Sequence, residues 1–205
     1  MLALGAGLII GGALVAVHSV AGRGPLTGAA LEIPAAVGTS APLPLTAPTA
    51  APLARSAPVR IEIPALGVSA PLMRLGVATN GSVQVPPVDN HDLAGWYDRS
   101  VTPGQRGSSV ILGHVDSFTG RSVFFSIKTL RPGNTVDVVR ADGSTAVFAV
   151  DGVQKALKSA FPASEVYGNV SFPSLRLVTC GGPFDSSTRQ YLDNIVVYAH
   201  LVRSS

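Results

Sequence analysis

The chain contains 205 residues, of which 46% are hydrophobic and 13% are charged, and its formal net charge at pH 7 is +3. Its basic residues are scattered and form neither a Lys/Arg cluster nor a stripe interleaved with aromatic residues, which argues against a nucleic-acid-binding protein. Cys180 is the only cysteine, so an internal disulfide is excluded, and one sulfur is a poor basis for a zinc site that needs several ligands.

The amino-terminal segment, residues 1–22, contains no Lys, Arg, Asp or Glu, and residues 2–20 are almost entirely Leu, Ile, Val, Ala and Gly. As a helix, residues 2–20 would be roughly 28 Å long, close to the hydrocarbon thickness of a bilayer. We therefore predict a transmembrane anchor in residues 1–22. A cleaved signal peptide is the alternative, because small residues surround a possible cleavage point near Ala21.

The charges that flank this segment bear on its orientation. No Lys or Arg precedes it and Arg23 follows it, so the positive-inside rule does not support an outward-facing domain. We still predict a single-pass protein of the cell membrane with its folded domain on the extracellular side, because the linker and domain that follow suit an exported protein.

Residues 23–58 have the composition of a linker. Between residues 24 and 54 the only charged residue is Glu32, and the segment is built mainly from Ala, Pro, Thr, Leu and Gly. Its repeated prolines oppose both helix and sheet, so we predict a disordered spacer that holds the following domain away from the membrane.

Residues 59–205 are enough for one domain with its own core. Short runs rich in Val, Ile, Leu and Phe alternate there with Gly, Pro, Asn and Asp. The predicted strands are 59–63, 72–77, 109–113, 135–140, 145–153, 176–179 and 194–202. Residues 120–130 have apolar residues at helical intervals and are followed by Pro132-Gly133, which predicts one short helix or turn. The pattern predicts a mainly β fold, a closed and mostly antiparallel barrel or a sandwich, with one or two short helices.

Cys180 lies where an apolar strand is predicted to end, directly before Gly181-Gly182-Pro183. Residues 175–180 alternate between two faces, which places Leu175 and Leu177 with Thr179 on one face and Val178 with Cys180 on the other. We expect the leucines inside the barrel and Cys180 in a groove on its outer wall. There the thiol is predicted to act as a nucleophile, and the alternative is a small buried hydrophobe.

His114 ends a second apolar strand and is the predicted partner of the thiol. A nearby charged imidazole stabilises a thiolate, and the same ring can protonate a leaving amine. His91, in a polar loop, is the second choice, whereas His18 and His200 fit less well. Asp116, two residues beyond His114, either orients the imidazole or remains in solvent.

Arg189 precedes the final strand and is the predicted cation of the site. A fixed guanidinium can donate to the oxyanion of a tetrahedral intermediate or hold the carbonyl groups of a substrate. Arg176 is the rival, but its backbone lies roughly 13 Å from that of Cys180 along the strand. A solvated surface arginine is the alternative for Arg189.

These residues resemble the sortases, the surface transpeptidases of Gram-positive bacteria. The strand end 177–180 is similar to the family's Leu-x-Thr-Cys motif, and Gly113-His114 and Arg189 are similar to its histidine and arginine. Residues 111–116 together with 179–185 resemble most closely the class F group of actinobacteria. In many sortases the arginine stands directly against the last apolar strand, whereas here residues 190–194 intervene.

The resemblance covers about residues 59–203 and implies an eight-stranded sortase barrel that cleaves an LPXTG-like sorting signal between Thr and Gly. Cys180 would form the thioacyl enzyme, His114 would protonate the departing amine, and Arg189 would steady the oxyanion. Val178, Thr179 and Asp116 are expected to contact the substrate. The implied partners are LPXTG-type surface proteins and a peptidoglycan precursor as the amine acceptor, with no cofactor and no metal.

Two other interpretations stay open at this point. An L,D-transpeptidase also pairs cysteine with histidine on a β fold, but the Ser-His-Gly-Cys type signature is missing around Cys180. The other is a membrane-tethered β-domain that binds a wall component without catalysis.

Overall fold

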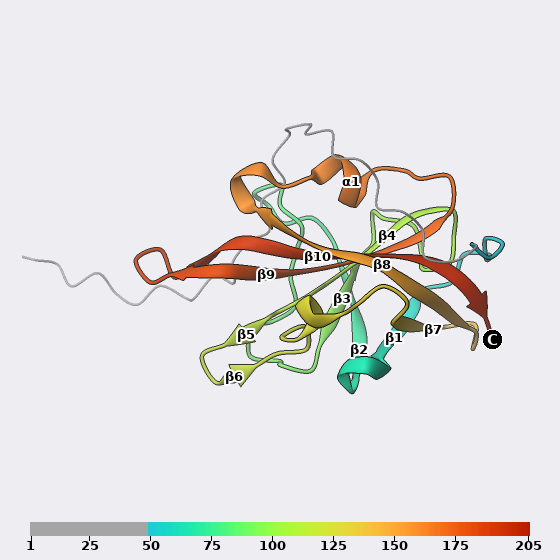
Figure 1. Cartoon of the computed structure of the whole chain (residues 1–205), viewed down its shortest axis with the longest axis horizontal. Coiled ribbons are helices and arrows are strands. Elements are labelled where there is room, and N and C mark those ends of the chain that lie inside the picture. The colour runs from blue at the N-terminus through green and yellow to red at the C-terminus, as the bar shows by residue number, and fades with distance from the viewer. Residues whose placement is uncertain (1–48) are drawn as a thin grey trace, which may run out of the picture.

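The computed structural model describes residues 49–205, so the predicted anchor and most of the predicted linker lie outside the described residues. Within this part, eight strands close into a barrel in the order β1-β2-β3-β4-β9-β10-β8-β7 (Figure 1). The barrel strands are β1 (Pro58–Ile63), β2 (Val68–Leu75), β3 (Ala94–Tyr97), β4 (Gly107–Gly113), β7 (Thr135–Arg140), β8 (Thr145–Leu157), β9 (Pro173–Asp185) and β10 (Gln190–Ser204). The prediction of a mainly β, closed eight-stranded barrel is confirmed.

The remaining elements are short. They are β5 (Asp116–Ser117) and β6 (Gly120–Arg121), which pair as a separate hairpin, the helix α1 (Ala163–Tyr167), and the 3-10 helices η1 (Pro64–Leu66), η2 (Ile127–Thr129) and η3 (Lys158–Ala160). The short helix or turn predicted over 120–130 is a turn followed by η2. Its apolar spacing has another cause, because Val123, Ile127 and Leu130 pack into the barrel core from an irregular segment.

Two layers of apolar side chains flank the wall formed by β4, β9 and β10. Leu175 and Leu177 belong to the cluster inside the barrel. Val178 packs outside it, in a cluster with Phe161 and with Val166 of α1. The predicted alternation of residues 175–178 is therefore confirmed. Because both faces of this wall are covered, β4 is buried along its whole length.

The strand β9 does not end at Cys180, contrary to the predicted break at Gly181-Gly182-Pro183. It continues to Asp185 and pairs antiparallel with β10, with Cys180 opposite Asn194. The glycines are accommodated by an irregular register on β10 and by a positive φ of 74° at Gly182. On its other side, however, β9 pairs in parallel with β4 only as far as Val178. Cys180 therefore pairs with β10 on one side and has no strand partner on the β4 side.

The last residues of the predicted linker lie against the barrel. The backbone N–H of Ala50 donates to the carbonyl of Leu201 over 2.8 Å, and that of Leu53 donates to the carbonyl of Gly104 over 2.8 Å. Arg140 reaches the carbonyl of Ala54 through its guanidinium. Residues 50–54 are thus attached to the barrel by backbone hydrogen bonds.

Candidate active site

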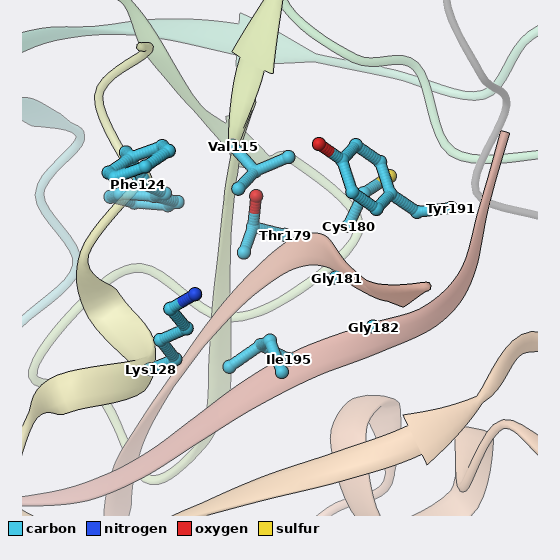
Figure 2. Close-up of a pocket in the computed structure, with 10 residues that line it drawn as sticks. Val115, Phe124, Lys128, Thr179, Cys180, Gly181, Gly182, Tyr191 and Ile195 are labelled. Carbon is cyan, nitrogen blue, oxygen red and sulfur yellow. The ribbon is translucent and has the colours of Figure 1, made fainter. Parts of the chain in front are cut away.

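Cys180 lies at one edge of the barrel, where it is partly buried. It lines a pocket together with Val115, Phe124, Lys128, Thr179 and Tyr191, which come from the loop after β4, the segment around η2, and strands β9 and β10 (Figure 2). Burial raises the pKa of the Cys180 thiol, and the carboxylate of Asp116 raises it further, while the charge of Lys158 lowers it. The thiol is therefore set between two opposing charges.

His114 follows the last residue of β4 and is brought to Cys180 by the strand pairing. In the parallel pair β4/β9, Leu112 lies opposite Val178, so two residues farther along each strand are His114 and Cys180. The His114 Nε2 atom lies 2.7 Å from the carbonyl oxygen of Pro86. Since a carbonyl only accepts, Nε2 carries a proton and donates it there. Nδ1 is then the nitrogen that can exchange a proton with the thiol.

Gly113 makes the close packing beneath His114 possible. A Cβ atom at this position would lie 2.6 Å from the ring of Phe124 and 2.8 Å from the side chain of Val123. The backbone N–H of Phe124 also donates to the carbonyl of His114 over 3.0 Å. The segment that lines the pocket is thus held directly against the end of β4.

Arg189 lies away from the thiol, in the turn that connects β9 and β10. It has a positive φ of 56°, and its guanidinium carbon lies 5.0 Å from the centre of the Phe118 ring. The residue of β10 opposite Cys180 is Asn194, so about 16 Å of extended chain separates Arg189 from the level of the sulfur. The structure does not bring Arg189 together with His114 and Cys180.

Asp116 is engaged by Tyr191, whose hydroxyl donates to the Asp116 Oδ2 atom. Burial, together with this carboxylate, raises the pKa of Tyr191 to about 12. Asp116 is thereby tied to β10, and no hydrogen bond joins it to the His114 imidazole within residues 49–205. The sequence pattern around residue 116 does not reveal this contact, because Tyr191 is 75 residues away.

The two other predicted substrate contacts differ in their surroundings. Val178 is completely buried in the outer apolar layer, so it supports the strand rather than lining the pocket. Thr179 lines the pocket, and its buried Oγ1 has no hydrogen-bond partner among the described residues. The Thr179 hydroxyl is therefore available for a hydrogen bond with a group of a bound substrate.

The remaining candidates have structural partners. His91 holds the β5–β6 hairpin, with Nδ1 3.0 Å from the Arg121 carbonyl and Nε2 2.6 Å from the Thr119 hydroxyl. His200 is buried and lies 2.7 Å from the Asp151 carboxylate. Arg176 is buried beneath α1, and this burial lowers its pKa to about 10. None of the three lines the pocket of Cys180.

Sequence reasoning missed Lys158, the first residue of η3. Its Nζ is buried, and it is the cation that acts on the Cys180 sulfur. Nothing in the local sequence marks this lysine, because its position depends on how β8 pairs with β10.

Two absences apply to residues 49–205. They contain no group of three or more His, Cys, Asp or Glu side chains arranged to hold a metal ion. Their helices are also too short and too polar to cross a bilayer.

The structure is a closed eight-stranded barrel in which a histidine follows β4 and a cysteine lies two residues past the last position at which β9 pairs with β4. The sortase domain family matches residues 61–202. The chain therefore belongs to the sortase family, whose members are transpeptidases that act on the sorting signals of surface proteins. A comparison with curated proteins found no match.

Solved sortase structures share the fold. Sortase E1 from Streptomyces coelicolor, determined with a tripeptide in its active site, is 18% identical with a TM-score of 0.55, over 74% of this chain and 93% of that one. Sortase A from Corynebacterium diphtheriae is 18% identical with a TM-score of 0.53, over 73% of this chain and 62% of that one. Sortase C1 from Streptococcus agalactiae is 20% identical with a TM-score of 0.53, over 71% and 67%. At these identities the likeness concerns the fold.

Proposed function

We propose that the chain is a cysteine transpeptidase that cleaves an LPXTG-like sorting signal between Thr and Gly and transfers the acyl group to a cell-wall amine. The observation that carries the proposal is the placement of His114 and Cys180 two residues beyond the last paired positions of β4 and β9. Both residues then lie at the same edge of the barrel, where Cys180 lines a pocket.

The first half of the reaction forms a thioester. The proton of the Cys180 thiol passes to the free nitrogen of His114, and the thiolate attacks the carbonyl carbon of the substrate threonine. The new C–S bond displaces the carbonyl π electrons onto oxygen, and their return breaks the C–N bond to glycine. The His114 imidazolium gives its proton to the departing amine.

The second half reverses the same proton path with a new amine. An incoming amine of a peptidoglycan precursor loses a proton to neutral His114 and attacks the thioester carbon. Collapse of the intermediate breaks the C–S bond and regenerates the Cys180 thiolate, which recovers its proton from the imidazolium. Arg189 has no step in this scheme, because its guanidinium lies over Phe118.

The proposed setting is the outer face of a cell membrane. It is supported by the uncharged segment 1–22 and the Pro-rich segment 23–58, which suit an anchor and a spacer. Within the family, the motifs in residues 111–116 and 179–185 favour class F of actinobacteria. Surface proteins that carry the sorting signal would be the substrates.

The test is incubation of the full-length chain with LPXTG and LAXTG peptides, followed by mass spectrometry. We expect an adduct on Cys180 equal to the peptide up to its threonine, and release of the glycine-containing remainder. The Cys180→Ala variant should give neither product, and a peptide with scrambled order serves as the control. Turnover by Cys180→Ala would refute the mechanism.

The peptide incubation also distinguishes a transpeptidase from a domain that only binds a wall component. The burial of the Cys180 thiol favours this second function. Burial raises the pKa of the Cys180 thiol, as expected for a packed side chain. A binding module would retain the peptide without any adduct or cleavage. The L,D-transpeptidase interpretation finds no support in the family match to residues 61–202.

A further inference from the structure

A buried lysine that acts on the Cys180 thiol, Lys158, has no role in the proposed reaction so far. Lys158 begins η3, immediately after β8, and its Nζ makes no hydrogen bond to an oxygen or nitrogen of residues 49–205. A buried ammonium group carries three donors, and leaving them unpaired is costly. Such a group is expected to have a counter-ion in some state of the protein.

Strand pairing explains how Lys158 reaches Cys180. Cys180 of β9 lies opposite Asn194 of β10, which in turn lies opposite Ala156 of β8. Residues in register point to the same side of a sheet, and Lys158 follows two residues beyond Ala156, as the first residue of η3. With strands about 4.8 Å apart and about 3.3 Å per residue, the Cα atoms of Lys158 and Cys180 are roughly 12 Å apart. The two side chains bridge that separation when they extend toward each other.

The other charged groups that face the thiol do not provide a counter-ion for a thiolate. Asp116 from β5 is negative and raises the thiol pKa, and Tyr191 from β10 is a neutral phenol bonded to Asp116. Arg189 lies over Phe118 in the β9–β10 turn. His114, at the end of β4, becomes positive only after it accepts a proton. Lys128 lines the same pocket, with its Nζ 5.9 Å from the centre of the Phe125 ring. Among residues 49–205, Lys158 is thus the cation whose charge acts on the Cys180 thiol.

We propose that Lys158 is a catalytic residue of this sortase, whose ammonium group pairs with the Cys180 thiolate in place of a family-type arginine. The inference rests on the proposed function, since it assigns a role within that reaction. The positive charge of Lys158 stabilises the negative sulfur before the C–S bond forms and again when the bond breaks. His114 alone moves the proton.

The test measures how fast iodoacetamide alkylates the thiol of the full-length chain between pH 5 and 10. Because Cys180 is the only cysteine, the added mass reports this one sulfur. Lys158→Met keeps the length of the side chain and removes its charge. We expect its alkylation profile to move to higher pH, with about tenfold slower alkylation at pH 7 for each unit of displacement. Lys158→Arg should recover most of the wild-type rate.

Two comparisons make the result decisive. Lys128→Met removes the lysine that lines the Cys180 pocket and should displace the profile less than Lys158→Met does. The melting temperature of Lys158→Met should equal or exceed that of the wild type, because an unpaired buried ammonium is lost. An unchanged profile in Lys158→Met, a larger displacement in Lys128→Met, or no recovery in Lys158→Arg would overturn the proposal.

If the proposed function is wrong, the peptide and alkylation experiments would give different results. In that case the wild-type chain would cleave none of the LPXTG or LAXTG peptides, whereas the alkylation profile would still depend on Lys158. If the peptides are cleaved, Lys158→Met should slow cleavage at pH 7 by a factor similar to that seen in alkylation. Equal cleavage rates in the two proteins would contradict the assigned role.

Discussion

His114 and Cys180 occupy equivalent positions, two residues past the last paired residues of the parallel strands β4 and β9. Parallel strands carry their carboxyl ends to the same edge of a sheet, so 65 residues of intervening chain do not separate these two residues in space. The hydrogen bond from His114 Nε2 to the Pro86 carbonyl orients the ring.

Replacement of His114 by Ala should lower kcat for peptide cleavage by about 10²–10⁴-fold, because the proton donor to the leaving amine is lost. Steady-state cleavage of an LPXTG peptide measures this. His91→Ala is the matched control, since His91 holds the β5–β6 hairpin and does not line the pocket. A loss in His91→Ala as large as in His114→Ala would contradict the assignment.

Replacement of Gly113 by Ala should destabilise the chain by about 1–3 kcal/mol, because the new methyl group would meet the Phe124 ring at 2.6 Å. Chemical denaturation monitored by circular dichroism measures the free energy of unfolding. Gly76→Ala is the control, since its Cβ would approach only the end of the Gln84 side chain, at 3.3 Å. Equal stability of the Gly113→Ala variant and the wild type would show that the ring moves aside freely.

Asp116→Asn should make the Cys180 thiol more reactive at neutral pH. The Asp116 carboxylate raises the thiol pKa, so its neutral isostere lowers that pKa and increases the thiolate fraction below it. We expect alkylation at pH 7 to accelerate by about two- to tenfold, with the rates converging above the thiol pKa in both proteins. A slower reaction in Asp116→Asn would indicate that Asp116 acts mainly through Tyr191.

Arg189→Ala should change peptide cleavage by less than about threefold, far below the roughly 10²–10³-fold typical of a lost oxyanion donor. The reason is that its guanidinium packs on Phe118, at the far end of the β9–β10 hairpin. Comparison of kcat with that of Phe118→Ala tests whether this contact matters at all. A loss of 10²-fold in Arg189→Ala alone would mean that the hairpin bends toward the thiol when substrate binds.

Asp151→Ala should destabilise the barrel by about 3–5 kcal/mol, because it leaves the buried imidazole of His200 without its carboxylate partner. Thermal unfolding measures the change as a lower melting temperature. Asp92→Ala, an exposed loop substitution, is the control and should have little effect. A melting temperature equal to that of the control would show that the pair contributes nothing to stability.

The local sequence pattern predicted most of the barrel strands but not where each strand ends. The bounds of β7 match the prediction at both ends, since Asp142-Gly143 encodes the turn that follows it. The prediction missed β3, which is short and contains Gly95, a residue that approaches Leu75 of β2 too closely for any side chain. It also ended β9 too early at Gly181, because pairing with β10 stabilises the extended chain through both glycines.

By itself the sequence determined the alternation of faces around Cys180, because side-chain direction in a strand follows from a local period of two. It also determined that His114 directly follows an apolar strand. Only the tertiary structure decided which cation meets the sulfur. Lys158 approaches across β10 through strand pairing, and the extension of the hairpin to Asp185 carries Arg189 away. Strand pairing is a non-local choice, which depends on the packing of the whole barrel rather than on any short segment.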